Sequence, residues 1–102
     1  MLYAINKTAE FDKWLSKVKD LRAKATIFNR INMISELGNF GDHHSVGSGV
    51  SELRIFVGKG YRVYYTVKDK QVVFLLCGGD KSNKKAQQAD IQQAQKLLKE
   101  LE

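Results

Sequence analysis

Apolar residues near the start of the chain follow first the pattern of a strand and then that of a helix. The run Leu2 to Ile5 is long enough for one strand and too short for a helix. Thr8 then stands where a helix N-cap is expected. The apolar positions after it are three and four residues apart and form one helical stripe: Phe11, Trp14, Leu15 and Val18. The pattern predicts a strand followed by a helix whose apolar stripe, Trp14 included, lies in the core.

A second, longer helix is predicted between Asp20 and Gly38. Asp20 can cap its start, and Gly38 can end it in the left-handed conformation. The expected apolar face of this helix comprises Leu21, Ile27, Phe28, Ile31, Ile34 and Leu37. The two helices should form a hairpin.

The second half of the chain reads as strands and one final helix. Residues 38–49 are rich in Gly, Asn, Asp, His and Ser and predict a loop of about a dozen residues. Alternating segments on either side of Gly58-Lys59-Gly60 predict a β-hairpin, and a turn at Asp69-Lys70 leads into an apolar central strand that Gly78-Gly79 ends. Ser82 or Asn83 can then cap a last helix. Its apolar side comprises Ala86, Ile91, Ala94, Leu97, Leu98 and Leu101.

The predicted order of elements is therefore βαα, then βββ, then α. It indicates an α+β fold with a twisted antiparallel sheet, an N-terminal helical hairpin and a C-terminal helix. No repeat, low-complexity stretch or linker divides the chain, so residues 1–102 should form a single domain.

The register of the hairpin decides which side chains meet. A three-residue turn at 58–60 puts residue 57 opposite 61, 55 opposite 63 and 54 opposite 64. Four residues then share the face that does not pack on the helices: Arg54, Phe56, Arg62 and Tyr64. A two-residue turn at Asp69-Lys70 places Arg62 opposite Cys77 and continues this face toward Lys81. Such a basic, aromatic surface suits single-stranded RNA, and an ordinary solvated sheet face is the alternative.

Composition and charge narrow the classes of function. The chain has 17 Lys+Arg against 11 Asp+Glu, a net charge of +6, and these charges are spread over the whole chain instead of lying in one terminal segment. This excess favours a polyanionic or an acidic protein partner over a role in solubility alone. No apolar run suits a membrane span or signal peptide, so a cytoplasmic protein is expected.

The single cysteine, Cys77, excludes a disulfide scaffold and a zinc finger and should be a buried apolar residue. His43-His44 are expected as surface residues, with proton transfer or metal binding as the alternative. Neither a metal nor a cofactor is expected.

Several motifs in order resemble a known family: the small RelE/ParE-superfamily toxins of bacterial type II toxin–antitoxin modules, in the HigB-like, phage-derived "addiction module killer protein" branch. The resemblance spans nearly the whole chain. It is carried by residues 11–15, Arg30-Ile31 and 38–42, and by the longer segments 46–55, 60–65 and 75–82. The family fold, a small twisted antiparallel sheet with two N-terminal helices and one C-terminal helix, agrees with the predicted order of elements.

The resemblance implies a ribosome-dependent mRNA endonuclease that inhibits translation until its antitoxin binds it. Such toxins cleave without metal and use the 2′-hydroxyl of the RNA as nucleophile. The implied partners are the ribosome with its mRNA and a helix-turn-helix, HigA-like antitoxin. Operator DNA would be bound only through the antitoxin complex, and no membrane is involved.

The resemblance also implies roles for particular residues. Arg62 would clamp the phosphate, and Lys81 would stabilise transition-state charge or protonate the leaving group. Arg54 would serve substrate or fold, while Asp80 would orient Lys81, act as base, or cap the turn before the last helix. Further RNA contacts are expected at Phe56, Lys59, Tyr64, Lys84 and Lys85.

One feature of the best-known relatives is missing. Their tyrosine or histidine near the start of the terminal segment has no counterpart in residues 82–87. The general base is therefore open among Asp80, a tyrosine at 61, 64 or 65, and a loop histidine. Two other functions are alternatives to the nuclease: inhibition of DNA gyrase by protein binding, as in ParE relatives, and an inactive corepressor module.

Overall fold

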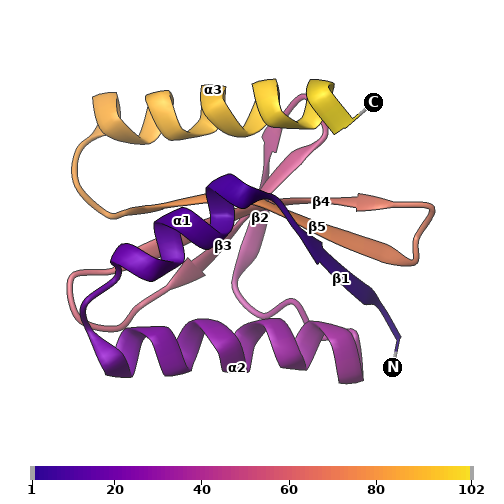
Figure 1. The fold of residues 1–102 in the computed structure, drawn as a ribbon, viewed down its shortest axis with the longest axis horizontal. Coiled ribbons are helices and arrows are strands. Elements are labelled where there is room, and N and C mark those ends of the chain that lie inside the picture. The colour runs from indigo at the N-terminus through magenta and orange to yellow at the C-terminus, as the bar shows by residue number, and fades with distance from the viewer. Residues whose placement is uncertain (1, 102) are drawn as a thin grey trace.

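The computed structural model describes residues 2–101, and a five-stranded sheet runs through its centre (Figure 1). The elements in chain order are β1 (Ala4–Lys7), α1 (Ala9–Lys17), α2 (Leu21–Leu37), β2 (His43–Gly47), β3 (Val50–Ile55), β4 (Tyr61–Lys68), β5 (Val72–Asp80) and α3 (Lys84–Leu101). The strand order across the sheet is β1-β5-β4-β3-β2. The predicted α+β fold and order of elements are confirmed. Because β1 pairs parallel to β5 while the other pairs are antiparallel, the sheet is mixed.

Local hydrogen bonds explain where the helices begin and end. The side chain of Thr8 accepts from Phe11 N, and the Asp20 carboxylate accepts from the first-turn N–H groups of α2. Asn83 Oδ1 accepts from Ala86 N at the start of α3. Gly38, at φ 67°, ends α2 in the left-handed conformation. These caps agree with the sequence predictions because each depends only on neighbouring residues.

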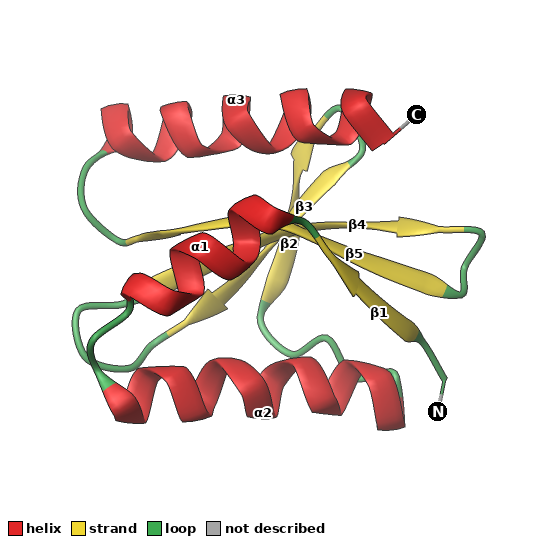
Figure 2. Ribbon diagram, viewed as in Figure 1, coloured by secondary structure: helices red, strands yellow, loops and turns green. Residues whose placement is uncertain are grey.

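The helices cover both faces of the sheet. α1 and α2 run in opposite directions on one face, and α3 lies across the other (Figure 2). The α1/α2 side holds the larger core cluster, which includes Phe11, Ile27, Leu53, Val63 and Leu75. The α3 side holds a second cluster: Val50, Tyr64, Leu76, Cys77, Ala94, Leu97 and Leu98. No helix among the described residues is long and apolar enough to cross a membrane.

The buried face of α2 differs from the predicted one. Leu21, Phe28 and Leu37 are exposed, whereas Ala23 is completely buried with Ile27, Ile31 and Ile34. The predicted face was too broad, because a helix against a flat sheet buries only one stripe.

The predicted loop 38–49 contains an edge strand. β2 pairs with β3, with His44 opposite Glu52, and its side chains are mostly exposed. Its Gly, His and Ser residues have low strand propensity, so the pairing with β3 decides its conformation.

The predicted hairpin register is wrong by two residues. Ile55 pairs with Tyr61 and Arg54 with Arg62, so residues 56–60 form a longer connection than the expected three-residue turn. A shift of two preserves the alternation of faces, and Arg54 and Arg62 still share a face. Phe56 lies beyond the end of β3, so strand alternation does not set its direction.

The last strand pair also differs from the prediction. The turn does fall at Asp69 and Lys70, both in the left-handed conformation, with Gln71 N donating to Lys68 O. Lys68 pairs with Val72, so three residues connect the strands instead of two, which shifts the pairing by one residue. An irregularity at Tyr64/Tyr65 shifts it by one more, so that Tyr64, not Arg62, lies opposite Cys77 and Arg62 lies opposite Gly79.

Gly78 and Gly79 lie inside β5 instead of ending it. A Cβ at Gly78 would lie 2.4 Å from the Trp14 ring of α1, and a Cβ at Gly79 would lie 2.1 Å from Oδ2 of Asp90 of α3. The glycines are therefore points of close approach, where one helix on each face contacts the strand backbone.

Candidate functional site

Two arginines lie directly opposite each other at one end of the sheet. Arg54 of β3 pairs with Arg62 of β4, an arrangement that is unfavourable for like charges unless each is compensated. Nη2 of Arg54 lies 3.1 Å from Oδ1 of Asp42, and Nε of Arg62 lies 3.5 Å from Oε2 of Glu52. Each guanidinium thus has its own carboxylate.

A small pocket joins this arginine pair to the segment after β5. The pocket has a volume of about 40 Å³ and is lined by Arg54, Ile55, Phe56, Tyr61, Arg62 and Lys81. Nζ of Lys81 lies 5.6 Å from the centre of the exposed Phe56 ring. Four predicted site residues, Arg54, Phe56, Arg62 and Lys81, therefore meet here; the pocket is called the cationic groove below.

Arg62 and Lys81 are the cations of the cationic groove that are available to a ligand. Within residues 2–101, the terminal nitrogens of Arg62 donate to no protein acceptor, and Lys81 forms no ion pair. Arg54 is instead part of a structural network, because both its Nε and its Nη2 donate to Asp42. Arg30 of α2 adds to this network by donating to the carbonyls of Arg54, Phe40 and Asp42. Of the two roles expected for Arg54, these contacts favour the structural one.

Glu52 is the site residue that the sequence analysis missed. Its side chain is 1% exposed and lies between two partners: Oε1 is 3.0 Å from Nε2 of His44, and Oε2 faces Arg62. The His44 side chain is 45% exposed, so a surface imidazole is connected to a buried arginine through one carboxylate. The alternation of residues along β3 already puts Glu52 on the same face as Arg54. Its burial could not be predicted, because the partners that compensate its charge come from the neighbouring strands β2 and β4.

Tyr64 does not present its ring to a ligand. It was expected to stack an RNA base, but it is completely buried under α3. Burial, together with the nearby charges of Glu52 and Asp90, raises the pKa of its hydroxyl well above the ordinary value. Its hydroxyl, Oε2 of Glu52 and Nε of Arg62 are buried without a hydrogen bond.

Asp80 pairs with a different lysine from the one expected. Its Oδ2 lies 3.1 Å from Nζ of Lys59, and this contact raises the pKa of the lysine. Lys81 thus points to Phe56 without being oriented by Asp80. Lys84 and Lys85 are exposed in the first turn of α3, which holds no acidic residue. The positive end of the helix dipole lies at the start of α3, so the two lysines add to a positive potential that no acidic side chain of this turn offsets. This end of the sheet therefore suits an anionic ligand.

Cys77 and Asp90 lie under α3, next to this network. Burial is the main cause that raises the pKa of the Cys77 thiol to about 12. It also raises the pKa of Asp90, with the charge of Asp80 adding to the effect and Arg62 opposing it. The thiol is therefore an unreactive core group, as the sequence predicted.

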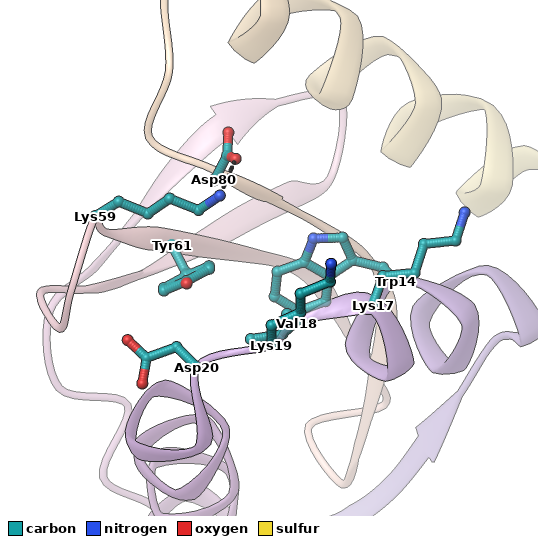
Figure 3. Close-up of a pocket in the computed structure, with 8 residues that line it drawn as sticks. All are labelled: Trp14, Lys17, Val18, Lys19, Asp20, Lys59, Tyr61 and Asp80. Atoms are coloured by element: carbon teal, nitrogen blue, oxygen red, sulfur yellow. Dashed lines mark ion pairs between the residues drawn. The ribbon is translucent and has the colours of Figure 1, made fainter.

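A much larger pocket lies on the other face of the same end of the sheet (Figure 3). It has a volume of about 670 Å³ and is lined by Trp14, Lys17, Val18, Lys19, Asp20, Lys59, Tyr61 and Asp80. We call it the Trp14 pocket. Figure 3 shows the ion pair of Lys59 and Asp80 at its rim.

Solved structures place the fold among the RelE-type toxins. The E. coli RelE toxin superposes with a TM-score of 0.65 at 16% identity, covering 88% of this chain and 96% of RelE. A mutant of the same toxin in the free state gives 0.68 at 18% identity over 90% and 97%. RelE in the intact RelBE toxin–antitoxin complex gives 0.63 at 17% identity over 79% and 99%. At these identities the likeness establishes the fold.

Sequence comparison gives the family. Residues 9–99 match the family of phage-derived Gp49-like proteins (DUF891), and the chain belongs to that family. An uncharacterised protein of Haemophilus influenzae is 52% identical over 101 residues, which cover 99% of this chain and 98% of the relative. The expected membership of a phage-derived family is thereby confirmed, and the fold is that of the RelE toxins.

Proposed function

We propose that this protein is the toxin of a toxin–antitoxin pair and that it cleaves mRNA on the ribosome. The observation that carries the proposal is the cationic groove, where Arg62 and Lys81 meet beside the exposed ring of Phe56. The terminal nitrogens of Arg62 and the ammonium of Lys81 contact no carboxylate among residues 2–101, so the two cations suit the phosphate of an RNA chain. The Phe56 ring suits a neighbouring base.

The residues of the groove fit a metal-independent transesterification. The 2′-oxygen of the RNA attacks the adjacent phosphorus and the bond to the 5′-oxygen breaks, giving a 2′,3′-cyclic phosphate and a 5′-hydroxyl end. Arg62, whose Nε lies 3.5 Å from Oε2 of Glu52, stabilises the charge that gathers on the phosphoryl oxygens, a contribution of about 10²–10³-fold for one such donor. To Lys81, the second cation of the groove, we assign the protonation of the departing oxygen.

His44 is our candidate for the group that accepts the proton of the 2′-hydroxyl. Tyr61, Tyr64 and Tyr65 are all buried, and burial raises the pKa of Tyr64 and Tyr65. Asp80 is paired with Lys59. His44 is exposed, is oriented through Nε2 by Glu52, and shares that carboxylate with Arg62. This arrangement matches the general use of a buried carboxylate to hold a catalytic imidazole.

An antitoxin partner follows from the same proposal. RelE, whose fold this chain shares, is known in complex with the antitoxin RelB. We expect the partner here to be a helix-turn-helix protein of the HigA type that covers the cationic groove in the cytoplasm, with operator DNA bound only by the complex. A surface of net charge +6 suits an acidic partner as well as RNA.

The test is to map mRNA 5′ ends in cells after a short pulse of expression without antitoxin. The comparison is between the parent chain, Arg62→Ala and the matched control Arg22→Ala, which removes an exposed arginine of α2. New ends in translated regions with the parent and the control, absent with Arg62→Ala, support the nuclease. Each variant is first shown to be folded by circular dichroism.

Two other results would overturn the proposal. Arrested growth with intact mRNA, together with recovery of DNA gyrase on the purified protein, identifies a ParE-like inhibitor. Intact mRNA with normal growth identifies an inactive module that acts only as a corepressor.

A further inference from the structure

The Trp14 pocket and the cationic groove occupy two faces of one strand end. Asp80 lines only the Trp14 pocket and its neighbour Lys81 lines only the groove, whereas Tyr61 lines both and connects them. We propose that the Trp14 pocket is a second RNA subsite, which binds one base of the strand whose phosphate lies at Arg62. This inference rests on the proposed function and extends it to a second contact with the substrate.

The Trp14 ring, held by two buried aromatic neighbours, forms the wall on which a base would stack. The rings of Trp14 and Tyr61 lie edge to face with centres 6.4 Å apart, and Phe11 supports Trp14 from behind at 5.9 Å. Trp14 is only partly buried and offers its ring to the pocket, whereas Tyr61, 6% exposed, supports that ring from the border of the pocket (Figure 3). Rings held in this way stack bases with little loss of side-chain entropy.

The charges around the pocket leave a positive balance. Among residues 2–101, Lys17 and Lys19 form no ion pair, while Lys59 and Asp80 neutralise each other. The carboxylate of Asp20 already accepts two hydrogen bonds at the start of α2. The two available lysines can therefore bind backbone phosphates on either side of the stacked base.

Size separates the roles of the two pockets. A volume of about 670 Å³ lies within the range of small-ligand sites, whereas the 40 Å³ groove has room for little more than a phosphate oxygen and its contacts. The base is therefore assigned to the Trp14 pocket and the phosphate to the groove.

The single tryptophan of the chain makes the proposal directly measurable. The probe is a single-stranded RNA of about six nucleotides, a length suited to one binding surface, with 2′-O-methyl groups that prevent cleavage. A second oligonucleotide of the same length carries the same phosphates but no bases. We expect the first to quench Trp14 fluorescence and the second to leave it nearly unchanged.

Charge variants connect the quenching to the pocket. Lys17→Glu and Lys19→Glu should each weaken binding at least about fivefold at low salt. Lys96→Glu makes the same charge change on the exposed side of α3 and should have little effect. Equal quenching by the abasic oligonucleotide, or none by an RNA that fluorescence anisotropy shows to be bound, would overturn the subsite. Equal quenching by poly-glutamate would overturn it too, in favour of an acidic protein partner.

The Arg62→Ala variant separates this inference from the nuclease. It should still quench Trp14 with the intact oligonucleotide while mRNA cleavage is lost. If the parent chain shows quenching of Trp14 but cleaves no mRNA, the RNA-binding pocket is supported and the nuclease is rejected. If the parent chain cleaves mRNA but shows no quenching, the nuclease is supported and the RNA-binding pocket is rejected.

Discussion

Glu52 reaches diagonally across the sheet to Arg62, with 3.5 Å between its Oε2 and the arginine Nε. Both side chains are largely withdrawn from solvent, the glutamate almost completely. A buried charge pair of this kind contributes little net stability, because desolvation offsets the attraction, but the loss of either partner is costly. The pair therefore fixes where the guanidinium lies more than it holds the fold together.

Replacing Glu52 tests this positioning role. Glu52→Ala should lower the free energy of unfolding by about 3–5 kcal/mol, because it leaves Arg62 buried without its carboxylate. Glu52→Gln keeps the size of the side chain and should fold, yet with RNA cleavage reduced at least about tenfold because a carboxylate no longer holds Arg62 and His44. Urea unfolding and cleavage of ribosome-bound mRNA measure the two effects. The control is Glu100→Gln, at an exposed position of α3; parental activity in Glu52→Gln would contradict the role.

Gly78 should be intolerant of even one methyl group. Its Cβ would lie 2.4 Å from the Trp14 ring, so Gly78→Ala should cost about 1–3 kcal/mol of unfolding free energy through overpacking. A double-mutant cycle with Trp14→Leu, read by urea unfolding, should recover part of that cost. Strict additivity of the two substitutions would show that the clash is not with Trp14.

Asp90 makes stability fall as the pH rises. Its folded-state pKa is raised, mainly by burial, so between the unfolded and folded pKa values the folded protein binds more protons than the unfolded chain. The contribution of Asp90 to stability is fully present below its pKa in the unfolded chain, and it is lost as the pH rises through its pKa in the folded protein. Asp90→Asn should therefore raise the urea midpoint at pH 7.5, and this gain should shrink at pH 4. A gain that is independent of pH would point to packing instead of charge.

Cys77 should resist thiol reagents while the protein is folded. With a thiol pKa of about 12 and a buried side chain, very little thiolate forms or is reachable at pH 8. Ellman's reagent should label the native protein orders of magnitude more slowly than the urea-unfolded protein, which is the internal control. Complete labelling of the native protein within the mixing time would show that α3 opens readily.

The features that sequence predicts well here are local ones. Thr8, Asp20 and Gly38 cap their helices through hydrogen bonds to residues at most five positions away, so their roles can be read from short segments. The convergence of Arg62 with Lys81 was also predicted, even though the expected register was wrong, because a slip of two residues keeps the same faces.

The features that sequence missed depend on distant partners. Glu52 is tolerated in the core only because His44 and Arg62 contact it from neighbouring strands. Tyr64 was predicted to contact RNA because the sequence of its own strand does not indicate that α3 covers it. The roles of the binding and catalytic residues stay predictions until the variants above are measured.

Gly78 and Gly79 carry a consequence for engineering this scaffold. Trp14 occupies the space above one glycine, and Asp90 occupies the space below the next. Two adjacent residues of one strand thus leave room for side chains from both helical layers, a rigid ring at Gly78 and a flexible carboxylate at Gly79. A designer who exchanges α1 or α3 for a segment from another protein must keep this dipeptide and the side chain that fits against it, or rebuild the spacing of the whole sandwich.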